Sequence, residues 1–283
     1  MSNLRIGLPS KGRLADQTAD LLKQAGLSFR RQERSLFARV SEIPVDVTFL
    51  RTDDIPLLCA EGAIDLGITG SDLIAESGTD LHTRLALGIG ACRLAVCVPD
   101  SSNLKSLREL DGCRAATSFP RVTEAFFAAH QAKVHLVPLS GSVEIMISLG
   151  VADAIVDLVE TGSTLAANHL RVLAEIGHYE TLLVQNDERR HPEVADRVVR
   201  RLEGVVIARA YSLLEYNVPR DRLAEAETIT PGFKSPTIND LEDPGWCAVQ
   251  VMVSRKEVIG VMDRLEEIGA TAILETRINN CRL

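Results

Sequence analysis

The chain has 283 residues, of which 46% are hydrophobic and 25% charged, as is ordinary for a globular protein with a buried core. The formal net charge of −8 argues against a broad nucleic-acid or membrane-surface role, which would need a basic field, but small anionic substrates need only local positive groups. The start has no signal-peptide layout, no apolar run approaches a membrane span, and the six cysteines form no C-x-x-C pair, so we expect a cytoplasmic protein with reduced thiols.

Short apolar runs alternate with helical patterns through about two thirds of the chain. We predict a strand at residues 4–8, a loop at 9–13, and then a helix that stops at Gly26. Strands alternating with helices indicate a largely parallel α/β sheet. The further segments of this alternation are residues 45–50, 53–60, 64–69, a helix from 71, 94–98, 114–117, 121–130, 134–138, 143–149 and 153–159.

The pattern changes after about Val205, at the end of an amphipathic helix. Beyond it we predict the order βαββαβ, which is the ferredoxin-like arrangement. Gly269 stands where the second helix of this group should end. The chain after Val205 is long enough for a small separate domain. The predicted segments are a strand at 209–217, a helix at 220–228, strands at 236–241 and 247–253, a helix at 256–268 and a strand at 271–278.

The segment after the strand at 153–159 predicts a phosphate site. Asp157 stands near the end of the strand, and the loop that follows carries hydroxyl side chains and Gly162 before a helix pattern begins near Leu165. Such a loop presents free backbone N–H groups and the positive end of a helix dipole to an anion. A helix cap with a turn glycine would have the same local sequence, so the segment alone leaves both interpretations open.

The upstream sequence decides between them. Nine residues match the signature of the ATP phosphoribosyltransferases, namely Glu144, Gly150, Ala152, Ile155, Asp157, Thr161, Gly162, Thr164 and Leu165. Further segments resemble that family at residues 8–14, 53–56, 65–72, 92–94, 116–120 and 141–144. The resemblance covers essentially the whole chain, and the C-terminal part resembles the regulatory domain of the family's long form.

The resemblance implies a fold, a division into domains and an activity. The fold is a two-lobed, type II periplasmic-binding-protein-like catalytic core followed by a ferredoxin-like, ACT-like domain. Residues 1–95 with 180–205 would form lobe I, residues 96–179 the lobe II that binds phosphoribosyl pyrophosphate (PRPP), and residues 206–283 a histidine-binding regulatory domain. The enzyme would join PRPP to N1 of ATP in the first step of histidine biosynthesis, with feedback inhibition by histidine. The implied partners are ATP, PRPP, histidine, AMP and further copies of the chain, in dimers or hexamers.

The chemistry of PRPP suggests a role for each site residue. Asp157 and Glu144 would hold the ribose hydroxyls and favour the positive charge that develops at C1′. Mg²⁺ would neutralise the departing pyrophosphate. N1 of adenine is unprotonated at neutral pH, so catalysis needs no strong base. The loop at residues 161–165 would hold the 5′-phosphate. The predicted PRPP-binding residues are Glu160, Thr161, Gly162, Ser163, Thr164 and Leu165.

Cations near the N-terminus are the predicted ligands of polyphosphate. Lys11, Gly12 and Arg13 follow the first strand, and Arg51 follows another. Without the family context, a solvated basic turn before a helix is the favoured interpretation of the first group, and a surface ion pair is the alternative for Arg51. The group is not a P-loop, because the lysine precedes the glycine. Asp72 opens a helix and is either a helix cap or a residue that borders the ATP cleft.

Four residues of the C-terminal domain are the predicted ligands of histidine. Ser235 and Thr237 lie in a segment that resembles the family's regulatory loop, and Thr271 and Ala272 would line the same site. A turn leading into a strand is the alternative for the first pair.

Two other functions fit parts of the sequence. A non-catalytic ligand-binding module would explain a two-lobed cleft but not a carboxylate next to a hydroxyl- and glycine-bearing loop. A salvage phosphoribosyltransferase uses a similar T-G-x-T loop, but the appended βαββαβ domain and the signature of residues 144–165 speak against it.

Overall fold

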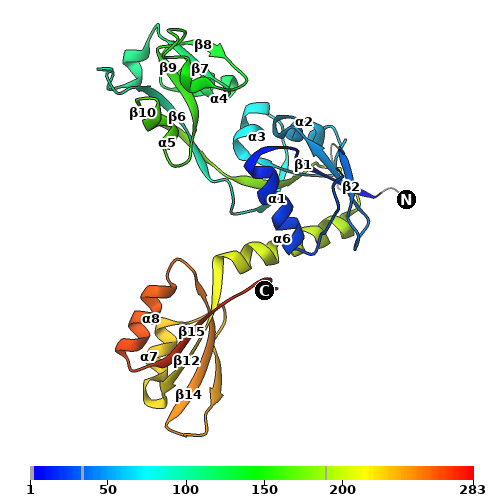
Figure 1. The fold of residues 1–283 in the computed structure, drawn as a ribbon, viewed down its shortest axis with the longest axis vertical. Helices are drawn as coiled ribbons and strands as arrows, with labels where there is room; N and C mark the ends of the chain where they lie inside the picture. The colour runs from blue at the N-terminus through cyan, green and yellow to red at the C-terminus, as the bar shows by residue number, and fades with distance from the viewer. Residues whose placement is uncertain (1–2, 33–34, 189) are drawn as a thin grey trace. The chain divides into compact units, whose positions relative to one another are not determined.

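The computed structural model describes residues 3–32, 35–188 and 190–283. By its packing the chain divides into two compact units. The first contains Met1–Asp20 and Ser28–Asp196, and the second contains Leu21–Leu27 and Arg197–Leu283. The long helix α6 (Pro192–Ala210) begins in the first unit and continues into the second (Figure 1). The three-domain division implied by the family resemblance stays a prediction.

The first unit holds two sheets, and the one near the N-terminus has six strands. We call this sheet with its helices the first lobe. Strand β1 runs parallel to β3 and β4, whereas β11 runs antiparallel to β4 and β5, and β2 antiparallel to β3. Its strands are, in spatial order, β2 (Phe37–Arg39), β3 (Val45–Leu50), β1 (Leu4–Pro9), β4 (Leu66–Gly70), β11 (Thr181–Gln185) and β5 (His82–Ala86). Its helices are α1 (Gly12–Gln24), the 3-10 turn η1 (Thr52–Asp54), α2 (Ile55–Ala60) and α3 (Ser71–Ser77).

Two glycines at the centre of this sheet let side chains pack close to the backbone. Gly7 of β1 pairs with Gly67 of β4. A Cβ atom on Gly7 would lie 2.4 Å from Ile64 Cδ1, and one on Gly67 would lie 2.8 Å from Ile55 Cγ2. Real Cβ atoms essentially never come so close, so a larger residue at position 7 would displace the Ile64 side chain, and one at position 67 would press against Ile55 of α2.

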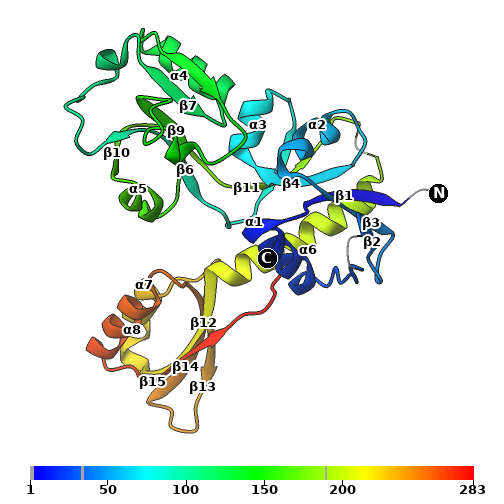
Figure 2. The same ribbon diagram turned by 45° about the horizontal axis from the view of Figure 1, so that its top comes forward.

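The second sheet of the first unit has five strands, and we call it with its helices the second lobe. Strand β7 runs parallel to β8 and β9, and β6 runs antiparallel to β9 and β10. Apolar residues of β6 and β9 alternate between two cores, one of which contains Phe127 of α4 and the other Leu165 of α5. The two helices therefore cover opposite faces (Figure 2). The strands are, in order, β10 (Leu170–Tyr179), β6 (Cys92–Pro99), β9 (Ala154–Val159), β7 (Arg114–Thr117) and β8 (His135–Pro138), and the helical elements are η2 (Leu107–Leu110), α4 (Pro120–Ala129), η3 (Val143–Ile145) and α5 (Ser163–Ala167).

The predicted two-lobed, type II arrangement is confirmed, but three local predictions were wrong. The sheets are mixed rather than largely parallel, because each contains one internal strand, β11 or β6, that is antiparallel to both neighbours. Strands β2, β5, β10 and β11 were not predicted. Residues 143–149 contain only the 3-10 turn η3. The residues on either side of the segment, Ser142 and Gly150, are in the left-handed conformation, with φ values of 51° and 69°, and a helix does not continue through such residues.

The two lobes are joined at two places, residues 87–91 between β5 and β6, and Glu180 between β10 and β11. A side-chain contact adds to these connections. The Glu76 carboxylate on α3 accepts hydrogen bonds from two backbone N–H groups in the first turn of α4. Arg121 N lies 2.9 Å from Oε1, and Val122 N lies 3.0 Å from Oε2. A carboxylate at this end of a helix satisfies otherwise free donors and interacts favourably with the helix dipole.

The second unit contains the predicted βαββαβ domain, which is confirmed. Its four strands are all antiparallel to their neighbours. Alternate residues of β12 and β14, such as Tyr216 and Val249, are buried against Val258, Val261 and Leu265 of α8. Gly269, with φ 89°, follows the end of α8 as predicted. The elements are β13 (Thr237–Asp240), β14 (Trp246–Ser254), β12 (Tyr211–Pro219) and β15 (Thr271–Arg277) in spatial order, with η4 (Arg220–Arg222), α7 (Leu223–Ile229) and α8 (Val258–Glu267).

Across the described ranges of the chain, none of the helices combines the length and the apolar character that a membrane span requires.

Candidate active site

The loop between β9 and α5 has the open backbone that phosphate binding requires. Gly162 is the N-cap of α5 in the left-handed conformation, with φ 79°. A Cβ atom there would meet no atom within 4 Å, so the space over this backbone is open. The Thr161 and Ser163 hydroxyl oxygens lie 3.0 Å apart beside it. Helix α5 begins at Ser163, two residues before the predicted start, and buried Leu165 fixes it against the sheet. The N–H groups of its first turn have no partner within the helix.

The loop lines a cavity of about 430 Å³ that also contains both predicted catalytic carboxylates. Asp157 lies on β9, and Glu144 reaches the cavity from η3, so two separate segments supply them. Arg13, from the first turn of α1 in the other lobe, completes the lining. All six predicted PRPP-binding residues belong to the lining, and the full set is Arg13, Glu144, Asp157, Leu158, Val159, Glu160, Thr161, Gly162, Ser163, Thr164 and Leu165.

The environment of Asp157 is unfavourable to its own negative charge. Burial raises the pKa of its carboxyl group, and the nearby charge of Glu144 raises it further. The backbone N–H of Leu158 opposes both effects by donating to Asp157 Oδ1 at 2.8 Å. A hydroxyl donor or a developing positive charge in this cavity would stabilise the charged form of Asp157. The pair is therefore suited to hold a diol next to a cationic centre.

An ion pair between Arg13 and Glu160 joins the two lobes at the mouth of this cavity. The hydrogen bond between them raises the pKa of the Arg13 guanidinium and lowers that of the Glu160 carboxyl. Their side chains are 64% and 40% exposed, and an ion pair so accessible to water is worth little free energy. An incoming polyphosphate can therefore take the place of Glu160 on Arg13.

A second cavity, of about 300 Å³, shares Arg13, Leu158 and Glu160 with the first. Its walls come from both lobes and include Asp72, which is 6% exposed. Burial raises the pKa of Asp72, the neighbouring Asp53 raises it further, and two backbone N–H groups oppose them. The rest of the lining is Leu14, Gln17, Thr52, Asp53, Gly70, Leu73, Gly90, Cys92, Phe119 and Thr181.

Asp72 is not a helix cap, which was one of the two interpretations of its position in the sequence. The N-cap of α3 is Gly70, and Asp72 is the second residue of the helix. A Cβ atom on Gly70 would lie 2.0 Å from Asp72 Oδ1, so glycine is needed where the carboxylate folds back over the chain. The side chain is thereby held in the wall of the second cavity.

The other predicted polyphosphate ligands lie outside these two cavities. Lys11 and Arg51 are exposed, and neither lines them. Gly12 begins α1 with φ 77°, a conformation that favours glycine. Sequence reasoning missed Gln17 and Thr181 as wall residues, because neither belongs to a recognisable motif. It noted Cys92 and Phe119 only as parts of family-like segments. Burial, with the charges of Asp72 and Glu160, raises the pKa of the Cys92 thiol to about 11.

The four predicted histidine ligands do not come together within one chain. Thr237 begins β13, and Ser235 precedes it by two residues, whereas Thr271 and Ala272 lie at the start of β15. These strands are the opposite edges of the sheet, with β14 and β12 between them. Three strand spacings amount to about 14 Å. Within a single chain the two pairs are therefore too far apart to share one small ligand, and their role as histidine ligands stays a prediction.

Within the described part of the chain, no three or more His, Cys, Asp or Glu side chains are grouped so as to hold a metal ion.

Comparison with known proteins gives the family. Residues 51–204 match the family model described as HisG, ATP phosphoribosyltransferase, and residues 208–280 match the model described as HisG, C-terminal domain. An ATP phosphoribosyltransferase of Rhodopirellula baltica is 68% identical over 282 residues, which is 100% of this chain and 94% of that protein.

The chain belongs to the ATP phosphoribosyltransferase family. It has the family's long form and is a pentosyl-transferring enzyme of histidine biosynthesis. A second relative, from Saccharopolyspora erythraea, is 42% identical and covers 99% of this chain and 100% of its own. A solved ATP phosphoribosyl transferase (HisG:HisZ) complex from Thermotoga maritima matches 72% of this chain and 98% of its own, with 29% identity and a TM-score of 0.64.

Proposed function

We propose that this chain transfers the phosphoribosyl group of PRPP to N1 of ATP, giving phosphoribosyl-ATP and pyrophosphate. The observation that carries the proposal is the cavity in which Glu144 and Asp157 share a wall with the open loop at residues 160–165. A sugar phosphate can contact both parts of this cavity at once. Its phosphate would bind the loop, and its diol would donate hydrogen bonds to the two carboxylates.

The adjoining cavity is the proposed site of ATP. It shares Arg13, Leu158 and Glu160 with the PRPP cavity, so a base bound there lies next to the ribose. N1 attacks C1′ as the bond to pyrophosphate breaks, and the carboxylates stabilise the positive charge on the ribose. Arg13, released from Glu160, takes a phosphate of either substrate. Positioning and electrostatics then account for catalysis without a general base.

We propose that Mg²⁺ binds together with PRPP, through the pyrophosphate group of this substrate. Pyrophosphate oxygens and carboxylates are the ligands that Mg²⁺ prefers, and the carboxylates of the PRPP cavity are those of Glu144, Asp157 and Glu160. The ion would neutralise charge on the departing pyrophosphate.

The direct test is incubation of the full chain with ATP, PRPP and magnesium, followed by mass spectrometry of the products. We expect phosphoribosyl-ATP and an equal amount of pyrophosphate. Parallel reactions with free purine bases test for a salvage phosphoribosyltransferase. Substrate binding without turnover of either kind would contradict the proposal and favour a binding module.

We further propose that histidine inhibits the enzyme through the C-terminal domain, in a cytoplasmic homo-oligomer that forms dimers and hexamers, and that AMP competes for the ATP site. Ser235 with Thr237, and Thr271 with Ala272, lie on opposite edges of one sheet. If both pairs contact one histidine, they must come from two subunits. Inhibition requires only that histidine bind one assembly better than another, by about 1–3 kcal/mol.

Mixed oligomers test the two-subunit site. Thr237→Tyr and Ala272→Tyr would each block histidine binding when present in every subunit. Mixing the two variants by dissociation and reassembly should restore some sites, because an interface formed by the two unsubstituted edges is intact. No recovery in mixtures shown by mass to contain both variants would contradict a shared site. A chain ending at Val205 that still responds to histidine would place regulation in the first unit.

A further inference from the structure

Helix α4 of the second lobe begins without a capping side chain of its own. Its N-cap residue is Phe119, whose side chain has no hydrogen-bonding group, and its first residue is Pro120, which has no N–H. The N–H of Thr123 already donates to the carbonyl of Phe119 at 3.0 Å. The N–H groups of Arg121 and Val122 are therefore the two that need a partner from outside the helix.

The partner of both groups is Glu76 of α3, in the first lobe. Its two carboxylate oxygens each accept one of the N–H groups, from Arg121 and from Val122. A helix is ordinarily capped by Ser, Thr, Asp or Asn at the N-cap position itself. Here the cap comes from the other lobe, which leaves the N-cap position to the aromatic side chain of Phe119.

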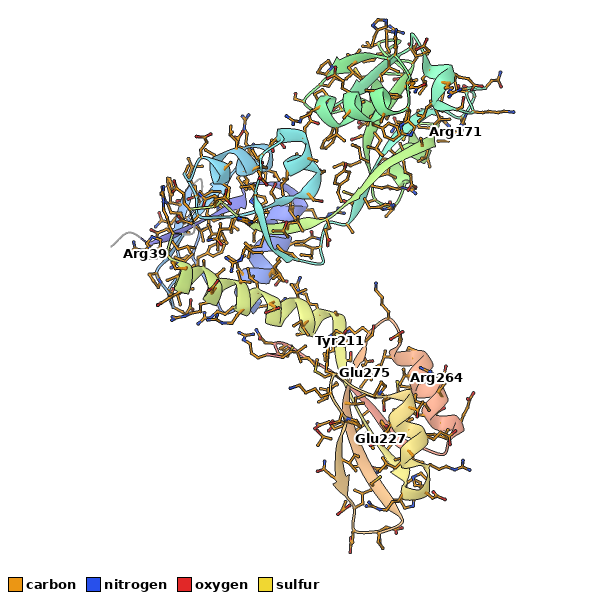
Figure 3. All side chains as sticks on the ribbon, turned by 180° about the vertical axis from the view of Figure 1, so that it is seen from behind. Arg39, Arg171, Tyr211, Glu227, Arg264 and Glu275 are labelled. Carbon is orange, nitrogen blue, oxygen red and sulfur yellow. The ribbon has the colours of Figure 1, made fainter. Side chains whose placement is uncertain are left out.

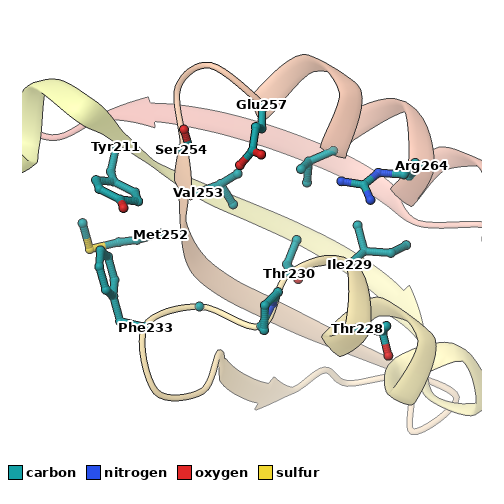
Figure 4. Close-up of a pocket in the computed structure, with 13 residues that line it drawn as sticks. Tyr211, Thr228, Ile229, Thr230, Phe233, Met252, Val253, Ser254, Glu257 and Arg264 are labelled. Atoms are coloured by element: carbon teal, nitrogen blue, oxygen red, sulfur yellow. The ribbon is translucent and has the colours of Figure 1, made fainter.

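Two other side chains show what is particular to Glu76. Arg171 of β10 also binds backbone groups, the carbonyls of Ser102 and Leu104, but all three residues belong to the second lobe (Figure 3). Glu257 is itself the N-cap of α8, and its side chain makes no capping hydrogen bond and lines a cavity of the C-terminal unit (Figure 4). Glu76 differs from both, because it caps a helix of one lobe from a helix of the other.

Helix α3 is attached at both of its ends. At its start, the Ser71 N–H donates to the carbonyl of Glu180 at 2.9 Å, and the Ser71 hydroxyl accepts the N–H of Glu180 at 3.1 Å. Glu180 is one of the two connections between the lobes. At its other end, a Cβ atom on Gly78 would overlap the Arg121 guanidinium, which lies against the C-cap of α3. The helix therefore has little freedom to move relative to α4.

The cavity that we assign to ATP is lined from both sides of this contact. Asp72 and Leu73 of α3 line it from the first lobe, and Phe119 lines it from the second. Leu73 also packs against the apolar cluster that contains Phe119. The Phe119 N–H donates to Thr117 Oγ1 at 2.9 Å, so this residue is fixed to its own lobe. Its place relative to Asp72 and Leu73 depends on how α3 and α4 are held together, and Glu76 supplies two hydrogen bonds to that contact.

We propose that Glu76 is a positioning residue for ATP. By capping α4 from the first lobe it sets the distance between Phe119 and the wall formed by Asp72 and Leu73, and a flat base packs well only where that distance is fixed. The proposal rests on the assignment of this cavity to ATP. The PRPP cavity depends on the contact much less, because all of its lining except Arg13 comes from the second lobe.

Steady-state kinetics of the full-length protein tests this role, with KM for each substrate measured at saturation of the other. Glu76→Ala should raise KM for ATP about tenfold and KM for PRPP less than about twofold, since two hydrogen bonds to a charged acceptor are lost at one wall of the ATP cavity. Glu76→Gln is nearly isosteric and keeps one acceptor oxygen, so its KM for ATP should rise about threefold. Titration of ATP alone gives the same comparison without turnover.

Glu109→Ala is the matched control. The Glu109 carboxylate also accepts two backbone N–H groups, those of Lys105 and Ser106, but all three residues lie within the second lobe and outside both cavities. Both Michaelis constants should therefore stay at the parental value. Melting curves compare the stability that each alanine variant loses, and a merely structural role would give Glu76→Ala the same unchanged ATP affinity as Glu109→Ala.

Phe119→Leu separates a failure of this proposal from a failure of the ATP site. If Phe119→Leu weakens ATP binding and the Glu76 variants do not, the site stands and the positioning role is wrong. If none of these variants changes the affinity for ATP, the site and the positioning role are both wrong. Equal losses of ATP and PRPP affinity in the Glu76 variants would also overturn the role, because they would indicate a general loosening of the first unit.

Discussion

The proposed PRPP site is formed by residues of one chain, whereas the proposed histidine site requires residues of two. In the first unit, Glu144, Asp157 and the loop at residues 160–165 come from neighbouring segments, and one chain brings them into a single cavity. In the C-terminal sheet, Thr237 and Thr271 belong to opposite edges. Loops that follow parallel strands meet at one end of a sheet, so order in the sequence predicts their convergence. Edge strands face away from each other, and a site that uses both needs a second subunit.

The largest expected effect concerns the carboxylates of the first unit. Asp157→Asn and Glu144→Gln should each lower kcat about 100- to 1000-fold, because they remove charge that acts mainly in the transition state. Steady-state kinetics with both substrates measures this. Asp100→Asn, an exposed carboxylate outside both cavities, and Thr237→Tyr should leave kcat unchanged. Near-normal kcat in both variants would contradict a catalytic role for Asp157 and Glu144, and the first unit would then differ from the C-terminal sheet in geometry alone.

A smaller effect is expected at Gly162. Gly162→Val should weaken PRPP binding about 10- to 100-fold and ATP binding much less, because a side chain would stand over the open backbone and φ is 79°. Calorimetry with each substrate separately gives both constants. Gly112→Val is the matched control, since Gly112 also has φ 80° and open space around its Cβ position but lies outside both cavities. Equal losses of PRPP and ATP affinity at Gly162 would mean that the loop is not dedicated to PRPP.

The cations of the first helix should contribute less. Lys11→Ala and Arg13→Ala are expected to weaken polyphosphate binding about three- to tenfold at low salt, with the difference from the parent shrinking as salt rises. Arg13 must leave Glu160 before it binds a phosphate, whereas Lys11 forms no ion pair among the described residues. Titrations at several salt concentrations compare them. An affinity and salt dependence identical to the parent would make the loop structural only.

The smallest expected effect is on stability. The pKa of Asp157 is raised in the folded protein by burial and by Glu144, so deprotonation costs stability as pH rises from the unfolded-state pKa through the folded one. Asp157→Asn lacks this cost and should melt a few degrees higher at neutral pH, on the order of 1 kcal/mol. The gain should vanish near pH 3, where the carboxyl is protonated in both states. Calorimetric melting at both pH values tests this, and a gain that persists at low pH would contradict the electrostatic cause.

Sequence reasoning predicted the parts of the fold that depend on local pattern. The strand and loop around Asp157 follow from an apolar run that ends in glycine and hydroxyl residues, and the βαββαβ domain follows from its alternating buried residues. It missed β10 and β11, because antiparallel strands inserted into a mixed sheet have no helix between them to mark the boundary. It also missed the pairing of Arg13 with Glu160, since a contact between two lobes depends on their packing.

The position of β11 has a consequence for how the protein is made. This strand lies between β4 and β5 and pairs with both, yet it follows the whole second lobe in the sequence. A ribosome therefore releases β4 and β5 several seconds before the strand that joins them. During that interval the first lobe has two unpaired strand edges exposed to other chains, while residues 92–179 can already form their own five-stranded sheet. Nascent chains stalled before Thr181 should accordingly need protection from aggregation that chains released after Gln185 do not.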